Sequence, residues 1–207
     1  MLVPVKGGDR AKSRLALGAD ARRALASAMA SDTVDAARAC PTVSRVTVLS
    51  SSWGATALAA PVQVLLEPEH PPLGLNALLD WATAQLPVGP VAVVMGDLPA
   101  LTPHALGEVL ESARALPRAL VVDRHGTGTT VLTSRSARDL QPAFGRDSAA
   151  AHEAGGARSV DAPAGVRCDV DDLEDLRHAS ALGVGPRTVA VLADRSLSLA
   201  VTGSAAD

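Results

Sequence analysis

Short apolar runs alternate along most of the chain with longer segments of helical period. The apolar runs are rich in Val, Leu and Thr, and we expect β-strands at 2–5, 45–50, 62–66, 91–95, 119–122 and 129–133. Segments with apolar residues three and four positions apart predict α-helices at 20–39, 75–86 and 103–115. This alternation is typical of an α/β fold, in which helices cover a mostly parallel sheet.

Two details sharpen the prediction around residue 95. Residues 91–95 are apolar at every position, as expected of a central strand that is covered on both faces. Thr102 stands directly before Pro103, and threonine is favoured as a helix N-cap while proline is favoured in the first helical position. We therefore expect a buried strand, a short loop and then a helix.

The pattern loosens after residue 133. Short helices are expected at 134–141 and 147–154, a strand at 166–170, and a helix at 171–182 that begins with acidic residues. This part is expected to fold back over the edge of the sheet. We interpret 1–193 as a single domain and the Ser- and Ala-rich stretch 194–207 as a flexible tail.

Composition and charge exclude several function classes. Aromatic residues make up only 1% of the chain, and the formal net charge is -3, so neither stacking platforms nor a basic field indicates nucleic-acid binding. The sequence shows no signal-peptide pattern and no apolar run of roughly 20 residues, so we expect no membrane partner. Cys40 and Cys168 lack metal-binding spacing, which fits reduced thiols in a cytoplasmic protein.

Ligands of open α/β sheets collect at the carboxyl ends of the strands, and the first such loop is basic. It follows the strand 2–5 and combines two glycines with the cations Lys6, Arg10, Lys12 and Arg14. Glycines let backbone amides approach an anion, and the cations could neutralise a triphosphate. The alternative is a solvated basic turn. The segment is not a P-loop, because the required glycine-lysine spacing is absent.

Acidic residues follow two of the expected strands. Asp97 comes directly after the buried strand 91–95, where a carboxylate could hold Mg²⁺ against phosphate oxygens, although an aspartate there can also form a turn. Asp169 and Asp171 alternate along the expected strand 166–170 and its end, so both fall on one side of the chain. Such a pair repels unless a cation lies between the carboxylates, but Asp171 or Asp172 could also cap the next helix.

Two further loops combine glycine, hydroxyl groups and arginine. One is 123–130, which contains Gly-Thr-Gly-Thr, and the other is 144–148, which ends in Ser148 at an expected helix start. Both have the composition of a phosphate-binding loop, while a glycine-rich hairpin turn is the alternative for the first. The histidines, among them His125 and His152, show no metal-ligand spacing and are interpreted as surface or structural residues.

Taken together and in order, these segments resemble a specific family. The matching stretches are 3–6 with 11–15, 74–78, 96–99, 123–129, 144–148 and 169–171, and the match extends over about residues 1–190. The chain is similar to the 2-phospho-L-lactate or phosphoenolpyruvate guanylyltransferases of coenzyme F-420 biosynthesis. The resemblance implies a MobA-like nucleotidyltransferase fold: a three-layer, Rossmann-like, mostly parallel sheet with helices on both faces.

The resemblance also implies a reaction and its partners. Enzymes of this family join GMP from GTP to the phosphate of a three-carbon acid, release pyrophosphate, and pass an unstable product to a downstream transferase. The cofactor would be Mg²⁺, with Asp97, Asp169 and Asp171 as its ligands. Thr129, Gly145 and Ser148 would bind the phosphate of the acid.

The remaining site residues are implied in the same way. Lys6 and Lys12 would face the GTP phosphates and act in catalysis together with Asp97. The other nucleotide-binding positions would be Arg10, Arg14 and Asn76. Two alternatives stay open: another MobA-like enzyme of the cytidylyl or molybdopterin type, and a non-catalytic nucleotide-binding domain.

Overall fold

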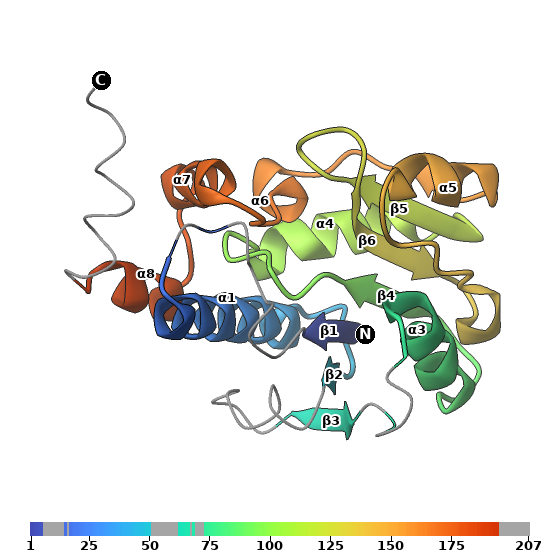
Figure 1. The fold of residues 1–207 in the computed structure, drawn as a ribbon. Helices are drawn as coiled ribbons and strands as arrows, with labels where there is room; N and C mark the ends of the chain where they lie inside the picture. Colours follow the sequence, from blue (N-terminus) through green and yellow to red (C-terminus); the bar gives the residue numbers. More distant parts are fainter. Residues whose placement is uncertain (6–14, 16, 51–61, 67, 69–72, 195–207) are drawn as a thin grey trace.

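The computed structural model describes residues 1–5, 15, 17–50, 62–66, 68 and 73–194. Within these ranges a seven-stranded sheet runs in the order β3-β2-β1-β4-β6-β5-β7 (Figure 1). The strands are β1 (Leu2–Val5), β2 (Thr47–Ser50), β3 (Gln63–Leu66), β4 (Val91–Val94), β5 (Arg118–Val122), β6 (Thr129–Ser134) and β7 (Arg158–Ser159). Only the pairs that β6 makes with β4 and β5 are antiparallel among these described strands, so the sheet is mostly parallel, as predicted.

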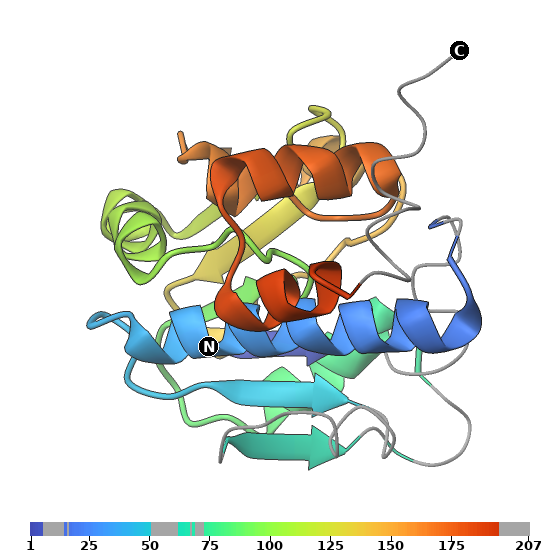
Figure 2. The same ribbon diagram turned by 90° about the vertical axis from the view of Figure 1, so that its left-hand side faces the viewer.

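Helices cover both faces of this sheet. They are α1 (Ala19–Ala39), α3 (Leu75–Ala84), α4 (Pro103–Ala113), α5 (Ser148–Ala154), α6 (Ala164–Arg167), α7 (Leu173–Leu182), α8 (Pro186–Leu192) and the 3-10 helix η1 (Ala137–Asp139). One apolar cluster joins α1, α4 and α6 to the sheet, and a second joins α3 and α5 to it. The predicted three-layer α/β architecture is confirmed, and α8 adds to it by packing against α1 (Figure 2).

Local sequence signals explain where the main helices begin and end. The Thr102 hydroxyl accepts a hydrogen bond from the Ala105 amide at 3.2 Å, so the predicted cap of α4 is confirmed. Helix α1 ends at Ala39, two residues before Pro41, which cannot continue a helix. The predicted helices at 147–154 and 171–182 are present as α5 and α7.

Two predictions in the second half of the chain were wrong. The expected strand at 166–170 is instead the helical turn α6 followed by an extended segment that joins no strand. The expected short helix at 134–141 is present only as the single 3-10 turn η1, and Ser134 is the last residue of β6. Tertiary packing overrides the local pattern here: a Cβ on Gly165 would lie 2.3 Å from the Ala100 carbonyl oxygen, so close contact with a distant loop shapes this turn.

The sequence pattern also missed β7 and α8. Strand β7 pairs with β5 and lies at one edge of the sheet. The start of α8 is held by a distant carboxylate, since the Arg187 and Thr188 amides donate to Asp32 of α1 at 3.1 and 2.8 Å. Among the described helices, none is both long and apolar enough to cross a bilayer. The predicted boundary at 193 stays a prediction, because most of the tail, 195–207, lies outside the described residues.

Candidate active site

The carboxyl ends of β4 and β5 and the start of the antiparallel strand β6 meet at one edge of the sheet. The Met95 amide, just after β4, donates to the Thr130 carbonyl of β6 at 2.9 Å. The Val170 amide donates to the Asp97 carbonyl at 3.1 Å, which brings the segment after α6 to the same place. Segments from three separate parts of the sequence therefore converge here, as expected for a ligand site in an α/β sheet.

The loop that carries Asp97 is held from several sides. A Cβ on Gly96 would lie 2.6 Å from the Pro4 carbonyl oxygen, so glycine is required where β4 ends close to β1. The Leu98 amide donates to the hydroxyl of Thr33 in α1 at 3.1 Å. The Gly185 amide, at the start of α8, donates to the Pro99 carbonyl at 2.9 Å. The backbone around Asp97 is thus fixed by contacts with three elements.

Asp169 and Asp171 lie on the outer side of an extended segment. Cys168 and Val170 are fully buried, whereas Asp169 is half-buried and Asp171 is exposed, so the alternation predicted for this stretch is present although the strand is not. Burial is the largest effect on Asp169, and together with the charges of Asp97, Asp171 and Asp123 it raises the pKa of Asp169 to about 7. The candidate carboxylates are therefore near one another.

This acidic cluster has the chemistry of a divalent-cation site. One oxygen of Asp169, Oδ1, is buried and has no hydrogen-bond partner among the described residues. Hard cations prefer such carboxylate oxygens. In the described part of the chain, no three His, Cys, Asp or Glu side chains already form a closed ligand set.

A buried carboxylate, Asp175 of α7, connects the acidic cluster to the loop after β5. Its Oδ1 accepts from Arg124 Nε at 2.7 Å and from His125 Nε2 at 2.9 Å. Its Oδ2 accepts from the amides of Asp171 and Asp172 at 2.9 and 3.2 Å. Burial by itself raises the pKa of Asp175, but these hydrogen bonds outweigh it and the pKa lies below its usual value. Asp172 also accepts from the Glu174 and Asp175 amides, so the predicted cap of this helix is confirmed.

Hydroxyl groups gather on the other side of the same edge. A β-bulge between Val121 and Val122 shifts the register of β5 against β6, next to Thr129. The Ser148 hydroxyl donates to Thr129 Oγ1 at 3.3 Å, and His152 Nδ1 lies 3.0 Å from the same oxygen. All three side chains belong to buried residues, so a polar cluster is enclosed between β6 and α5.

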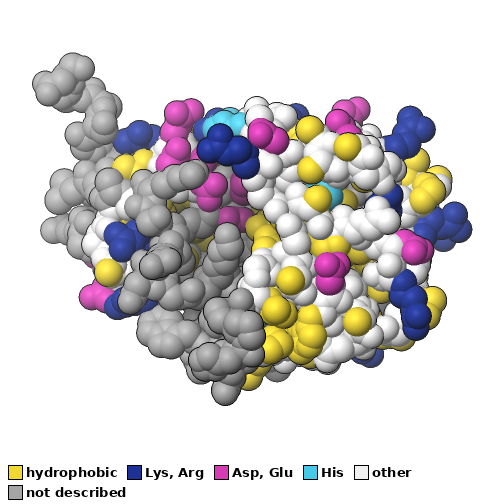
Figure 3. Space-filling view, turned by 45° about the vertical axis from the view of Figure 1, so that its right-hand side comes forward, with side chains coloured by type: hydrophobic (Ala, Val, Ile, Leu, Met, Phe, Trp, Pro, Cys, Tyr) yellow, Lys and Arg dark blue, Asp and Glu magenta, His cyan; other side chains and the backbone are white. Residues whose placement is uncertain are grey.

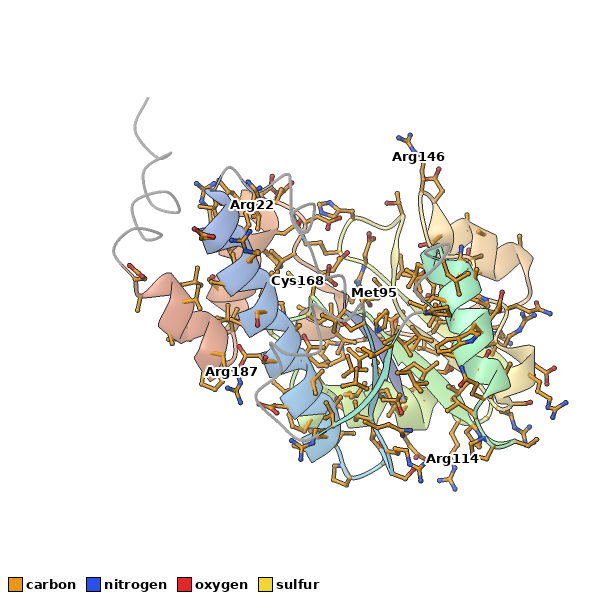
Figure 4. The ribbon with its side chains drawn as sticks, turned by 60° about the horizontal axis from the view of Figure 1, so that its bottom comes forward. Arg22, Met95, Arg114, Arg146, Cys168 and Arg187 are labelled. Carbon is orange, nitrogen blue, oxygen red and sulfur yellow. The ribbon has the colours of Figure 1, made fainter. Side chains whose placement is uncertain are left out.

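The loop that precedes α5 presents its backbone to solvent. Asn76 of α3 holds it by two hydrogen bonds to Phe144, from Nδ2 to the carbonyl at 3.0 Å and from the amide to Oδ1 at 2.8 Å. Gly145 has φ +138°, a backbone conformation that favours glycine, and Asp147 has φ 53°. Gly145, Arg146 and Asp147 are exposed, and Arg146 extends away from the fold (Figure 4).

The structure brings most of the described candidate residues together. Asp97, Asp169 and Asp171 lie on one side of the site, and Thr129 and Ser148 lie in contact on the other, with Gly145 in the adjoining loop. Figure 3 shows acidic side chains gathered beside basic and histidine side chains on this face. The predicted cationic residues Lys6, Arg10, Lys12 and Arg14 lie outside the described residues.

Sequence reasoning missed the groups that support these side chains. Thr33, His152 and Asp175 have partners up to 65 positions away, and nothing in the local pattern marks them. For Asp175 a signal was present, since Asp172 followed three positions later by an acidic residue is a capping box. The side chain of Asn76 is engaged with Phe144, so it shapes the loop before α5, whatever else it contacts.

Comparison with known proteins identifies the family. The family model described as guanylyl transferase CofC like matches residues 1–203. The chain belongs to the CofC-like family. It is 47% identical to a phosphoenolpyruvate guanylyltransferase of Streptomyces coelicolor, over 93% of this chain and 95% of that protein. It is 44% identical to one of Streptomyces avermitilis, over 93% of each.

Solved structures share the fold of this CofC-like chain. A candidate nucleotide-diphospho-sugar transferase of Desulfovibrio desulfuricans superposes with a TM-score of 0.67 at 14% identity, over 97% of this chain and 95% of that one. A CMP-keto-deoxy-octonic acid synthetase bound to CTP gives 0.56 at 15% identity, over 87% and 96%. A Mycobacterium tuberculosis protein in complex with manganese gives 0.54 at 18% identity, over 86% and 96%. The predicted fold is therefore confirmed.

Proposed function

We propose that the protein transfers GMP from GTP to the phosphate of a three-carbon phospho-acid, phosphoenolpyruvate or 2-phospho-L-lactate, in coenzyme F-420 biosynthesis. The observation that carries the proposal is the convergence of an acidic cluster and a cluster of hydroxyl groups at one edge of the sheet. Membership of the CofC-like family and the names of its relatives support the same reaction. A reaction that consumes GTP fits the cytoplasm, and its product would pass to a downstream transferase.

Asp97, Asp169 and Asp171 would hold Mg²⁺ in this reaction. The buried, unsatisfied Oδ1 of Asp169 and the all-carboxylate donor set fit a hard divalent cation. The manganese complex of a structural neighbour supports a divalent metal on this fold. When bound, the ion supplies positive charge that neutralises phosphate oxygens. The three carboxylates come from segments fixed by backbone hydrogen bonds, so they position whatever cation they hold.

The protein's own residues would bind and orient the two substrates. Thr129, Gly145 and Ser148 would hold the phosphate of the acid, and Lys6 and Lys12 would neutralise the GTP phosphates together with Arg10 and Arg14. Asn76 fixes the loop of Gly145 and would lie near the nucleoside. An oxygen of the acid phosphate attacks the α-phosphorus, a P–O bond forms, and pyrophosphate leaves. That oxygen is already ionised, so positioning and charge account for catalysis without a general base.

Replacing Asp97 tests the proposal. We expect Asp97→Asn to lower kcat by roughly 100-fold or more, because an amide is a weak ligand for a hard cation, while the fold is kept. Turnover is measured as pyrophosphate release with Mg²⁺ and GTP, and far-UV circular dichroism checks the fold. Asp161→Asn, at an exposed residue outside the cluster, is the control and should match the parent protein. Parent-like rates for Asp97→Asn at saturating Mg²⁺ would contradict the metal role.

A panel of substrates separates this function from its alternatives. Each of the four nucleoside triphosphates is offered with phosphoenolpyruvate, 2-phospho-L-lactate and 3-phosphoglycerate. Release of pyrophosphate with GTP and one of the first two acids is the expected result. Preference for CTP would indicate a cytidylyltransferase, for which the fold alone leaves room. Tight GTP binding without pyrophosphate release, for every acid, would indicate a non-catalytic domain.

A further inference from the structure

His152 lies in the second turn of α5, and the geometry around its ring fixes which nitrogen carries the proton. The Ala143 amide donates to Nε2 at 2.9 Å. A backbone N–H can only donate, so Nε2 must present a lone pair. A neutral imidazole has one donor nitrogen and one acceptor nitrogen, so the proton of His152 is on Nδ1.

This tautomer determines the direction of the hydrogen bond to Thr129. Nδ1 lies 3.0 Å from Thr129 Oγ1, and because Nδ1 carries the proton it cannot accept from that hydroxyl; its N–H is placed to donate to Thr129 Oγ1, with the Ser148 carbonyl as a second acceptor. The Ser148 hydroxyl donates to the same oxygen at 3.3 Å. Two donors occupy the two lone pairs of Thr129 Oγ1, so the hydroxyl proton of Thr129 is left to donate to another group. A threonine held in this way has a hydroxyl proton available for one further acceptor.

We propose that His152 is a positioning residue of the acceptor site, which directs the Thr129 hydroxyl as a donor toward the phosphate of the phospho-acid. The proposal rests on the proposed function, in which Thr129 and Ser148 bind that phosphate. Through its other nitrogen the same ring fixes Ala143, at the start of the loop that carries Gly145. One side chain thus sets both the direction of a donor and the place of the loop beside it.

The surroundings of the ring keep it neutral. The rings of His152 and Phe144 pack in a T-shaped arrangement, with centroids 4.9 Å apart and planes at 75°. Burial lowers the pKa of His152, the positive charge of Arg118 on β5 lowers it further, and the Ser148 carbonyl of α5 opposes them. The net shift is downward from 6.5, so the neutral form that the hydrogen bonds require is the form present at neutral pH.

Two substitutions separate the two nitrogens of His152. The amide nitrogen of His152→Asn can take the place of Nδ1 and still donate to Thr129, but no acceptor remains for Ala143. The amide oxygen of His152→Gln can take the place of Nε2 and accept from Ala143, but the donor to Thr129 is lost. We expect His152→Gln to raise the KM for the phospho-acid roughly tenfold, with kcat and the KM for GTP within about twofold, because one hydrogen bond to a charged group is weakened. His152→Asn should keep the KM for the acid within about threefold.

The pH dependence of the KM for the acid provides a further test, because a residue with a purely structural role would not change it. In the parent protein the KM for the acid should stay level above about pH 6.5 and rise by at most about threefold, the limit expected for His152→Asn, as the pH falls through the lowered pKa of His152, because a proton on Nε2 breaks the bond from Ala143 while Nδ1 still donates to Thr129. The substrate phosphate also titrates near pH 6 and affects both proteins equally. The KM for the acid of the parent protein is therefore divided by that of His152→Asn at each pH. That ratio should rise at low pH.

The tautomer is measured independently of activity. In ¹⁵N-histidine-labelled protein, the ring nitrogens of His152 should show the neutral Nδ1–H form at pH 7.5, with His152→Asn giving the assignment. An Nε2–H or charged ring would overturn the proposal, as would an unchanged KM for the acid in folded His152→Gln. If the parent protein turns over no acid while the ring is neutral with its proton on Nδ1, the proposed function fails and the orientation of Thr129 stands.

Discussion

The hydroxyl of Thr33 makes one of the contacts that hold the loop of Asp97 in place. It is fully buried, donates to the Met29 carbonyl within α1 at 2.9 Å, and accepts from the Leu98 amide at 3.1 Å. Thr33→Val keeps the shape but leaves that amide buried without an acceptor, which costs about 1–3 kcal/mol. We expect the free energy of unfolding, measured in urea, to fall by about that amount, and kcat to fall because the loop of Asp97 moves.

Thr33→Ser is the matched variant, because it retains the hydroxyl and removes only a methyl group. It should keep the kcat of the parent protein and lose about 1 kcal/mol of stability or less. Equal kcat values for the Val and Ser variants would show that the bond to Leu98 does not position Asp97.

At the scale of single residues, the charged candidate residues could be predicted from the sequence, but the residues that hold them in place could not. Asp97, Asp169 and Asp171 could be selected because a carboxylate after a buried strand, or a pair on one side of an extended segment, is a local pattern. His152 was interpreted as a surface or structural residue, because its contacts with Thr129 and Ala143 depend on how α5 packs against β6. Such contacts follow from the fold and leave no mark on the neighbouring sequence.

At the scale of elements, α7 depends on Asp175 for its connection to the loop after β5. Asp175→Asn removes the charge while keeping the shape. The new side-chain NH2 group is a donor, and it must lie opposite other donors: either Arg124 and His125, or the two backbone N–H groups. Its side chain is 3% exposed, and breaking such a buried pair costs about 3 kcal/mol. We expect a loss of stability of this size in urea unfolding, together with lower kcat, since either the Asp171 amide or the Arg124 guanidinium loses its acceptor.

Glu174→Gln provides the control for this variant. Glu174 pairs with the same guanidinium at 3.2 Å, but its side chain is 78% exposed, so water screens the pair and little stability is at stake. The substitution should change the free energy of unfolding by about 0.5 kcal/mol or less. A similar loss for both variants would mean that the interaction of Asp175 is not a buried one.

The elements that the sequence predicted best are those that local physics determines. Helix α4 has its threonine cap and proline, and β4 is apolar at every position, so both were found within two residues of their ends. Strand β7 has two residues and α8 begins on a carboxylate of α1, so both depend on long-range contacts. The prediction of a strand at 166–170 was wrong for the same reason. The alternation of residues correctly predicted which side of the segment Asp169 lies on, but the close contact between Gly165 and Ala100 determines the backbone conformation.

At the scale of the whole molecule, the fold places mutually repelling carboxylates where a cation would relieve the repulsion. The charges of Asp97, Asp171 and Asp123 act on Asp169, which is also partly desolvated, so the metal-free protein is under electrostatic strain. Mg²⁺ at 100 times its Kd adds about 2.7 kcal/mol of stability, which for a chain of this length corresponds to a rise in Tm of roughly 5–10 °C. We expect that rise when Mg²⁺ replaces EDTA in a thermal melt.

Asp169→Asn should separate stability from function in the same melt. Removing one of the repelling charges should raise the Tm in EDTA above that of the parent protein, because the desolvated carboxylate and its repulsion are gone. The further rise with Mg²⁺ should shrink, because the ion loses a ligand, while the exposed control Asp161→Asn should melt like the parent protein under both conditions. Two results would show that the cation binds elsewhere. One is a parent protein whose Tm does not change with Mg²⁺, and the other is an Asp169→Asn variant whose Tm rises with Mg²⁺ as much as that of the parent protein.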